Sequence, residues 1–166
     1  MKELFQGRRF GFAPRPVLAF LAVGLAIGVT LVDLMAYFAW GSRETNGYVV
    51  VAYWLAIGTT IVAGLAALTA LAEFVDVLDE ERGLAQLDLA ATVVAFFVYA
   101  VSAALRSTEV GAAAPSPAPF LGSMAGLLIL LVDSVVAANL YAAREWEELE
   151  EEPSRERHPR RRVASR

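Results

Sequence analysis

The sequence predicts an all-α integral membrane protein, a four-helix up-down-up-down bundle with both termini in the cytoplasm. Two observations carry this prediction. Hydrophobic residues make up 57% of the 166-residue chain, whereas soluble domains average about 45–50%. The charged residues are gathered in short patches that separate four long apolar runs. A helix needs about 20 mostly apolar residues to cross a bilayer, and each run reaches that length.

The four runs form one predicted transmembrane domain over residues 17–143, between an N-terminal arm (1–16) and a charged tail (144–166). The first run is too long for the apolar region of a signal peptide, which spans about 7–15 residues, so we expect it to be retained as a helix. Short links between the runs favour an up-down-up-down bundle. The predicted helices are Val17–Trp40, Tyr48–Ala72, Leu84–Leu105 and Phe120–Ala143.

The distribution of Lys and Arg predicts the orientation. Of the 14 Lys and Arg residues, only Arg43 and Arg106 lie in the links after the first and third runs. Positive charge concentrates on the cytoplasmic side of membrane proteins. We therefore expect the N-terminal arm, the link between the second and third helices, and the tail to be cytoplasmic.

The tail is acidic over 145–152 and basic over 155–166. Blocks of like charge with few apolar residues do not fold alone, so we expect the tail to be disordered. Its simplest role is that of a solvated anchor on the positive side of the membrane. The alternative is a docking segment, or a basic segment attracted to anionic lipid.

Two acidic residues, Asp33 and Asp133, fall inside predicted helices. Counted along each helix, Asp133 is near the midplane and Asp33 about 7 Å towards the outside. Because no Lys, Arg or His falls inside the predicted helices, both carboxyls are expected to be neutral and hydrogen-bonded. The expected partners are Thr30, Tyr37, Ser134 or a backbone carbonyl. Such acids act either as glue between helices or as a proton or ion relay, and both interpretations stay open.

Glycines in two predicted helices indicate close helix packing. Gly24 and Gly28 in the first helix, and Gly122 and Gly126 in the fourth, have the spacing of small-xxx-small motifs. Such motifs let helix backbones approach closely in membranes. The spacing does not distinguish contacts inside this bundle from contacts with another protein.

Catalytic and metal-binding sets are missing from the sequence. It has no cysteine, and its one histidine, His158, lies in the tail, so haem or zinc held by histidines of this chain is excluded. No phosphate-binding loop or nucleophile–base pair is recognisable. We expect no enzyme activity, no metal, no nucleic-acid partner, and no cofactor bound by this chain alone. A pigment or lipid shared at a subunit interface is compatible with the sequence.

Several short motifs resemble an uncharacterised bacterial family of four-helix membrane proteins, catalogued as a domain of unknown function. The similarity covers roughly residues 14–143. Members open the first helix with His-Pro and place an Asp eighteen residues later, where this chain has Arg15-Pro16 and Asp33. Their third helix begins with a His followed four residues later by Asn, where this chain has Asp88 and Thr92. The resemblance implies that both family histidines, residues suited to binding a haem or pigment, are replaced here.

We therefore expect a non-catalytic accessory or assembly subunit of a larger bacterial inner-membrane complex, for example one for electron transfer or light harvesting. Its expected partners are membrane lipids and either other membrane subunits or further copies of itself. The alternative is a small oligomeric proton-linked transporter or channel that uses Asp33 and Asp133.

Overall fold

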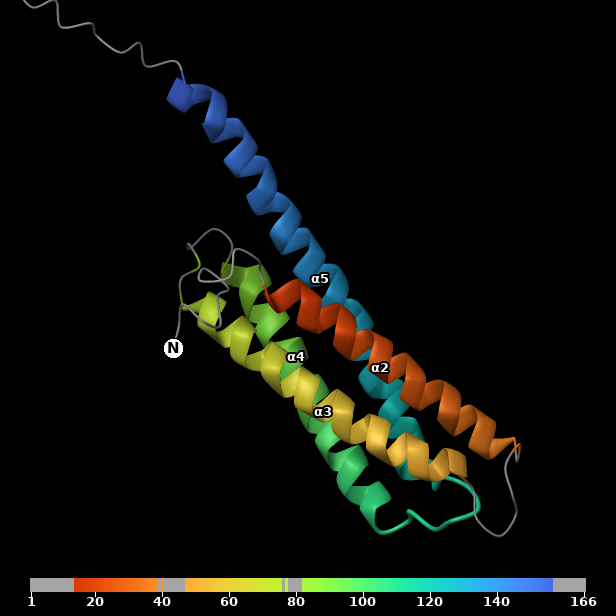
Figure 1. The fold of residues 1–166 in the computed structure, drawn as a ribbon. Helices are drawn as coiled ribbons and strands as arrows, with labels where there is room; N and C mark the ends of the chain where they lie inside the picture. Colours follow the sequence, from red (N-terminus) through yellow and green to blue (C-terminus); the bar gives the residue numbers. More distant parts are fainter. Residues whose placement is uncertain (1–13, 39, 41–46, 76, 78–81, 157–166) are drawn as a thin grey trace, which may run out of the picture.

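The computed structural model confirms an all-α four-helix bundle. It describes residues 14–38, 40, 47–75, 77 and 82–156, with the helix path only over 141–156, and this part contains no strand. In chain order its helices are α2 (Pro14–Tyr37), α3 (Gly47–Phe74), α4 (Arg82–Ser107) and α5 (Pro117–Glu156). Figure 1 shows them lying side by side along one long axis.

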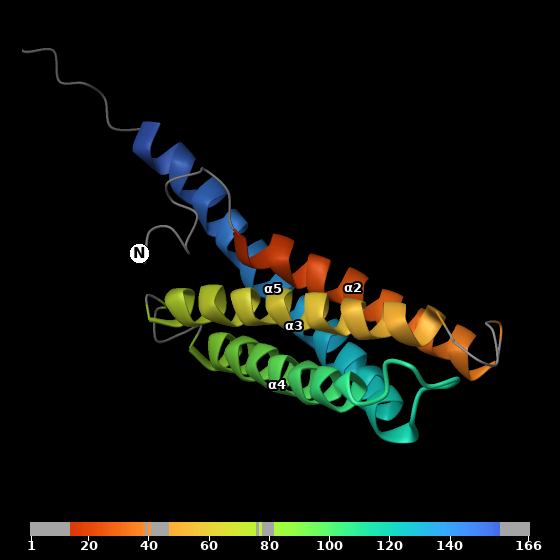
Figure 2. The ribbon, with the colours of Figure 1, turned by 60° about the horizontal axis from the view of Figure 1, so that its bottom comes forward.

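The helices follow one another around the bundle and alternate in direction. α2 packs against α3, α3 against α4, α4 against α5, and α5 against α2, which leaves α2 and α4 on one diagonal (Figures 1 and 2). α2 and α4 therefore run parallel. We call the end where they begin the Arg15 end, and the end where they finish the Arg106 end.

Every helix contributes a seam of buried residues spaced alternately three and four positions apart. This spacing is the heptad pattern of helices packed side by side in a left-handed sense. Alanine is the commonest seam residue, and its small side chain lets the helices approach closely where no hydrophobic effect acts between them. The seam of α2 is Arg15, Ala19, Ala22, Ala26, Val29, Asp33 and Ala36, and that of α4 is Ala85, Asp88, Thr92, Ala95, Tyr99, Ser102 and Arg106. The seam of α5 is Pro119, Ser123, Gly126, Leu130, Asp133, Ala137 and Leu140.

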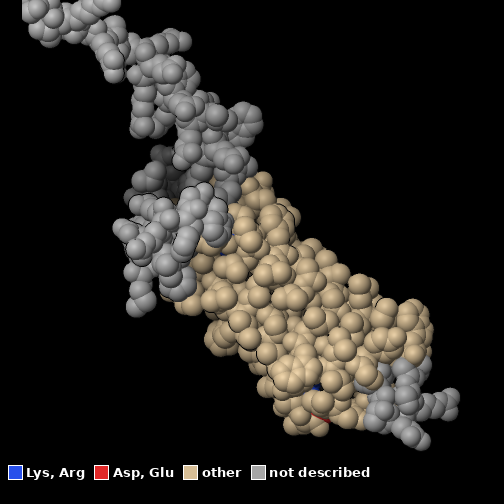
Figure 3. Space-filling model, viewed as in Figure 1, with Lys and Arg blue, Asp and Glu red and all other residues tan. Residues whose placement is uncertain are grey.

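The outward surface of the bundle is apolar. Each helix contains a stretch long and apolar enough to cross a membrane, with mean hydropathy between 1.9 and 2.4. Large side chains such as Phe20, Trp54, Phe97 and Leu128 are about 60% exposed. Figure 3 shows that the described part of this face is almost free of charged residues. A surface of this kind suits contact with lipid, and the protein is a multi-pass membrane protein.

The helix ends differ from the predicted ones by a few residues. α2 begins at Pro14 and ends at Tyr37, where Val17 and Trp40 were expected. Proline is tolerated in the first turn because the amide that it lacks has no partner there. The last three residues of the predicted arm are thus helical, and residues 1–13 lie outside the described part.

The tail expected to be disordered from residue 144 is helical as far as Glu156, where α5 ends. Glu and Arg fill nine of the thirteen positions from 144 to 156 and are strong helix formers, so the helix continues after its apolar part ends. The rest of the predicted tail, 157–166, lies outside the described residues. Figures 1 and 2 show α5 projecting well past the other helices at the Arg15 end.

Candidate functional site: two buried ion clusters

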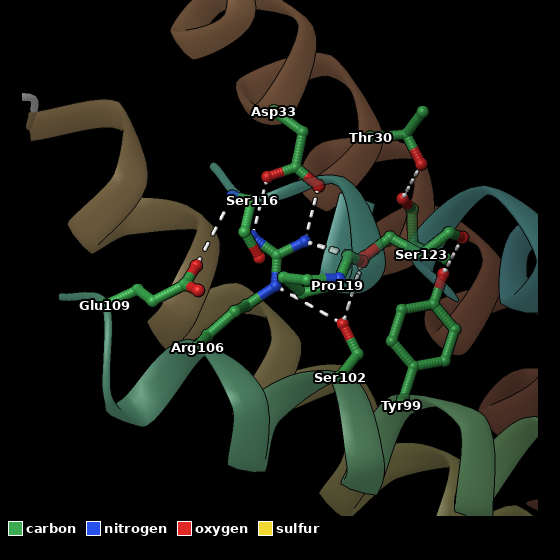
Figure 4. Close-up of polar contacts among 10 residues, drawn as sticks. Thr30, Asp33, Tyr99, Ser102, Arg106, Glu109, Ser116, Pro119 and Ser123 are labelled. Carbon is green, nitrogen blue, oxygen red and sulfur yellow. Dashed lines mark hydrogen bonds and ion pairs between the residues drawn. The ribbon is translucent and has the colours of Figure 1, made fainter. Parts of the chain in front are cut away.

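The Arg106 end contains a buried cluster centred on one guanidinium (Figure 4). Arg106 on α4 forms a two-point ion pair with Asp33 on α2, Nη1 donating to Oδ1 at 2.7 Å and Nη2 to Oδ2 at 2.5 Å. Nη2 also donates to Ser123 Oγ at 2.8 Å, and Nε donates to Ser102 Oγ at 3.3 Å. The Pro119 carbonyl accepts a further hydrogen bond from Nη2 at 3.2 Å. α2, α4 and the first turns of α5 therefore meet on one side chain.

The Arg15 end contains a second cluster built from the same three helices. Arg15 on α2 holds Asp88 on α4 by a similar fork, with Nε to Oδ2 at 3.1 Å and Nη2 to Oδ1 at 2.7 Å. Nη2 also lies 2.9 Å from each carboxylate oxygen of Asp133 on α5. Thr92 Oγ1 lies 2.7 Å from Nη2 and 2.9 Å from Asp133 Oδ1.

Both clusters are shielded from the surroundings. The side chains of Arg15, Asp33, Asp133 and Arg106 are between 0% and 2% exposed, and that of Asp88 is 5% exposed. A buried charge is costly unless it is paired and hydrogen-bonded. In a membrane this cost is a strong reason for the pairs to form inside the bundle.

The expectation that the two intramembrane acids lack a cationic partner is wrong. Arg106 pairs with Asp33 and Arg15 pairs with Asp133. Both arginines fall outside the predicted helices, but α2 begins three residues earlier and α4 ends two residues later than predicted, so the helices include them. Their guanidinium groups then lie inside the bundle, between 0% and 2% exposed.

The hydrogen-bond partners proposed for the acids from the sequence are also corrected. Thr30 donates to the Ala26 carbonyl at 3.0 Å, and Ser134 donates to the Leu131 carbonyl at 2.8 Å. The ring of Tyr37 stacks on Phe120 with the centroids 5.9 Å apart. The hydroxyls of Thr30 and Ser134 are satisfied locally, because Thr and Ser hydroxyls in helices bond readily to a carbonyl three or four residues earlier.

A sequence signal for these clusters does exist. Arg15 and Asp33 are eighteen residues apart in α2, and Asp88 and Arg106 are eighteen apart in α4 with the order of charges reversed. Eighteen residues make five full helical turns, about 27 Å, so each pair shares one face. Because α2 and α4 run parallel, the reversed order puts opposite charges together at both ends.

Three of the five positions singled out by the family resemblance meet in the Arg15 cluster. Arg15, Asp88 and Thr92 bond to one another, and Pro16 lies next to Arg15 in the first turn of α2. The two positions where the family has histidines thus carry an ion pair here. Among the described residues no group of three or more His, Cys, Asp or Glu could hold a metal.

The four glycines occupy different environments. A Cβ at Gly126 would lie 2.6 Å from the Tyr99 ring, so this glycine permits close packing of α5 on α4. At Gly28 and Gly122 a Cβ would make ordinary contacts, at 3.6 Å with Leu55 and at 3.8 Å with Ser102. At Gly24 it would meet nothing within 4 Å. Gly24 is exposed on the outside of α2.

Comparison with known proteins finds no matching family model, no matching curated protein and no matching solved structure.

Proposed function

We propose that the protein is a non-catalytic accessory subunit of a larger complex in a bacterial inner membrane, with both termini in the cytoplasm. The observation that carries this proposal is that the charged seam residues have one another as partners. Arg15, Asp33, Asp88, Arg106 and Asp133 bond to one another across the bundle. Ion pairs between helices fix the positions of those helices, which is a structural role.

The packed side chains between the two clusters favour a structural role over a role in transport. Ala22, Ala26, Ala56, Ala95 and Tyr99 are 0% exposed and belong to one packed core. A path linking Asp33 to Asp133 would have to cross this core. Close packing of small side chains leaves little room for water along that line.

Two features are suited to a partner. Beyond Leu140, α5 continues for 16 residues to Glu156, about 24 Å of helix that projects past the bundle (Figure 1). Gly24 leaves an open position on the outer face of α2, where another membrane helix could approach closely. A lipid or pigment shared with that helix is compatible with such an interface.

Native purification with a matched pair of variants tests the proposal. In a mild detergent we expect the wild-type protein to migrate with other membrane proteins in fixed stoichiometry. Gly24→Ile should release it from them without lowering its unfolding temperature, because the added side chain points away from the bundle. Leu128→Ala, at another exposed position, is the control and should change neither property. A wild-type protein that migrates alone from native membranes would contradict the proposal.

A proton-linked transporter or channel is the second candidate, and one observation favours it. The Arg15 cluster contains two carboxyl groups, Asp88 and Asp133, for one arginine. Intramembrane acids of this kind occur in proton pathways. A proton flux in liposomes that Asp133→Asn abolishes, with the fold intact, would favour transport over the accessory role.

A further inference from the structure

The two clusters differ in charge balance. Arg106 faces one carboxyl group, Asp33, and its other partners are neutral hydroxyl and carbonyl oxygens. Arg15 faces two, Asp88 and Asp133. With every group ionised, the Arg106 cluster is neutral and the Arg15 cluster carries one net negative charge. An uncompensated charge at a buried position is so costly that the group usually becomes neutral instead.

The Arg15 cluster also has too few hydrogens for its close oxygen contacts. Nη2 carries two hydrogens, but four oxygen atoms lie within 2.9 Å of it, on Asp88, Thr92 and Asp133. Nη1 is buried and has no hydrogen-bond partner in the described structure, so its hydrogens do not serve these oxygens.

The contacts of the Thr92 hydroxyl indicate which oxygen carries the additional hydrogen. Its Oγ1 lies 2.7 Å from the carbonyl oxygen of Asp88, one turn earlier in α4, and 2.9 Å from Asp133 Oδ1. A hydroxyl has one hydrogen to donate. When it donates to the Asp88 carbonyl, the bond a threonine in a helix ordinarily makes, the contact with Asp133 needs a hydrogen on Asp133.

We propose that the Arg15 cluster is a proton-binding site, in which Asp133 carries the proton and donates it to Thr92 Oγ1. The fork of Arg15 already holds both oxygens of Asp88, which leaves Asp133 as the carboxyl group that takes the proton. The bound proton comes from bulk water, and its uptake turns a cluster of net charge −1 into a neutral one. The Arg106 cluster is neutral already and binds no extra proton. This proposal does not depend on the protein having a partner.

Among the residues that the structure describes, few other charged groups lie near this cluster. From α2 the charged group is Arg15, and from α4 it is Asp88, with Arg82 exposed at the start of the helix. α3 presents Thr69 as a buried polar residue, and its acidic residue at this end, Glu73, is partly exposed. Asp133 is the charged residue of the α5 seam. Of the described residues, Asp88 and Asp133 are therefore the two carboxyl groups available to the proton. The arginine fork already occupies both oxygens of Asp88.

Infrared spectroscopy of the full-length protein in lipid at neutral pH tests this proposal. A protonated carboxyl group has a carbonyl stretching band distinct from that of a carboxylate, and labelling aspartate with carbon-13 moves the band if an aspartate carries it. We expect one such aspartate band in the wild type. Asp133→Asn should remove the band, and Thr92→Val should shift it by removing the hydrogen-bond acceptor.

Ser123→Asp provides a matched gain of function. Ser123 lies beside Arg106 as Asp133 lies beside Arg15, so this change gives Arg106 a second carboxyl group. We expect a second aspartate band. The absence of an aspartate band in the wild type would overturn the proposal. So would a band that survives Asp133→Asn, or one that Thr92→Val leaves unmoved.

Discussion

Arg106 and Asp33 join the two helices that lie on a diagonal of the bundle, through a two-point ion pair between residues 73 positions apart. Arg15 and Asp88 repeat this pair at the other end, also 73 positions apart, with the arginine on the opposite helix. An ion pair thus joins α2 and α4 at both ends, and α5 hydrogen-bonds to each pair. Each of these two helices therefore contributes one arginine and one aspartate to the two ion pairs.

Removing one partner of the Arg106 pair should be far more damaging than removing both. Arg106→Met leaves Asp33 buried without a cation, and breaking a buried pair in this way costs about 3–5 kcal/mol. Arg106→Met combined with Asp33→Leu should cost less than Arg106→Met alone, because no charge is left unpaired. Reversible unfolding in detergent micelles measures both variants. Equal losses in the single and double variants would show that the pair is not the source of the stability.

The side chain of Asp133 should tolerate an amide but not a hydrocarbon. Asp133→Asn keeps one oxygen that accepts from Arg15 and gains hydrogens that can reach Thr92, so we expect a change within about 1 kcal/mol. Asp133→Leu removes the hydrogen bonds that join α5 to Arg15 and Thr92, and a hydrogen bond to a charged group contributes about 1.5–3 kcal/mol. Unfolding in detergent again measures the difference. A stable Asp133→Leu variant would mean that α5 needs no polar contact at this position.

The bundle was predictable because its signals are local. Runs such as Val17–Trp40 are long and apolar, and such runs identify membrane helices by length and composition alone. The helix ends were less certain, since proline can begin a helix and Glu-rich sequence can continue one. Pro14 and Glu156 are two of the ends that composition alone misplaced.

The clusters were harder to predict because the error in the helix ends hid them. Arg15 and Arg106 sit just outside the predicted helices, where a charged residue needs no explanation. Their contacts depend on which faces of α2 and α4 meet. Only the matched spacing of Arg15 with Asp33 and of Asp88 with Arg106 carries this information in the sequence, and it becomes readable once the two helices are known to run parallel.

Reporter fusions should establish the orientation of the four helices. Fusions after Gly47 and within residues 112–119 should report the outside, and fusions after Gly83 and Arg144 should report the cytoplasm. The physical reason is the excess of Lys and Arg in the arm and tail. An alkaline phosphatase and a fluorescent protein report opposite sides and serve as mutual controls. A cytoplasmic signal from a fusion at Ala114 would contradict a structure that crosses the membrane four times.

Adding one methyl group at Gly126 should loosen the contact between α4 and α5. The new Cβ would lie 2.6 Å from Cε2 of Tyr99, and 3.1 Å from Cδ2 and Cζ. That ring is 0% exposed and its hydroxyl donates to the Ser123 carbonyl at 3.1 Å, so it has little freedom to move. Overpacking of this kind costs about 1–3 kcal/mol, and we expect Gly126→Ala to lower the unfolding temperature in detergent.

Gly24→Ala is the matched control, because the same methyl group meets nothing within 4 Å there. Alanine favours a helix over glycine by up to about 1 kcal/mol, so this variant should be as stable as the wild type or more so. Tyr99→Ala supplies the second test, since removing the ring also removes the clash. In that background Gly126→Ala should cost much less than it does alone, which a double-mutant cycle measures as a coupling energy. Additive losses would mean that the methyl group at 126 disturbs something other than the Tyr99 ring.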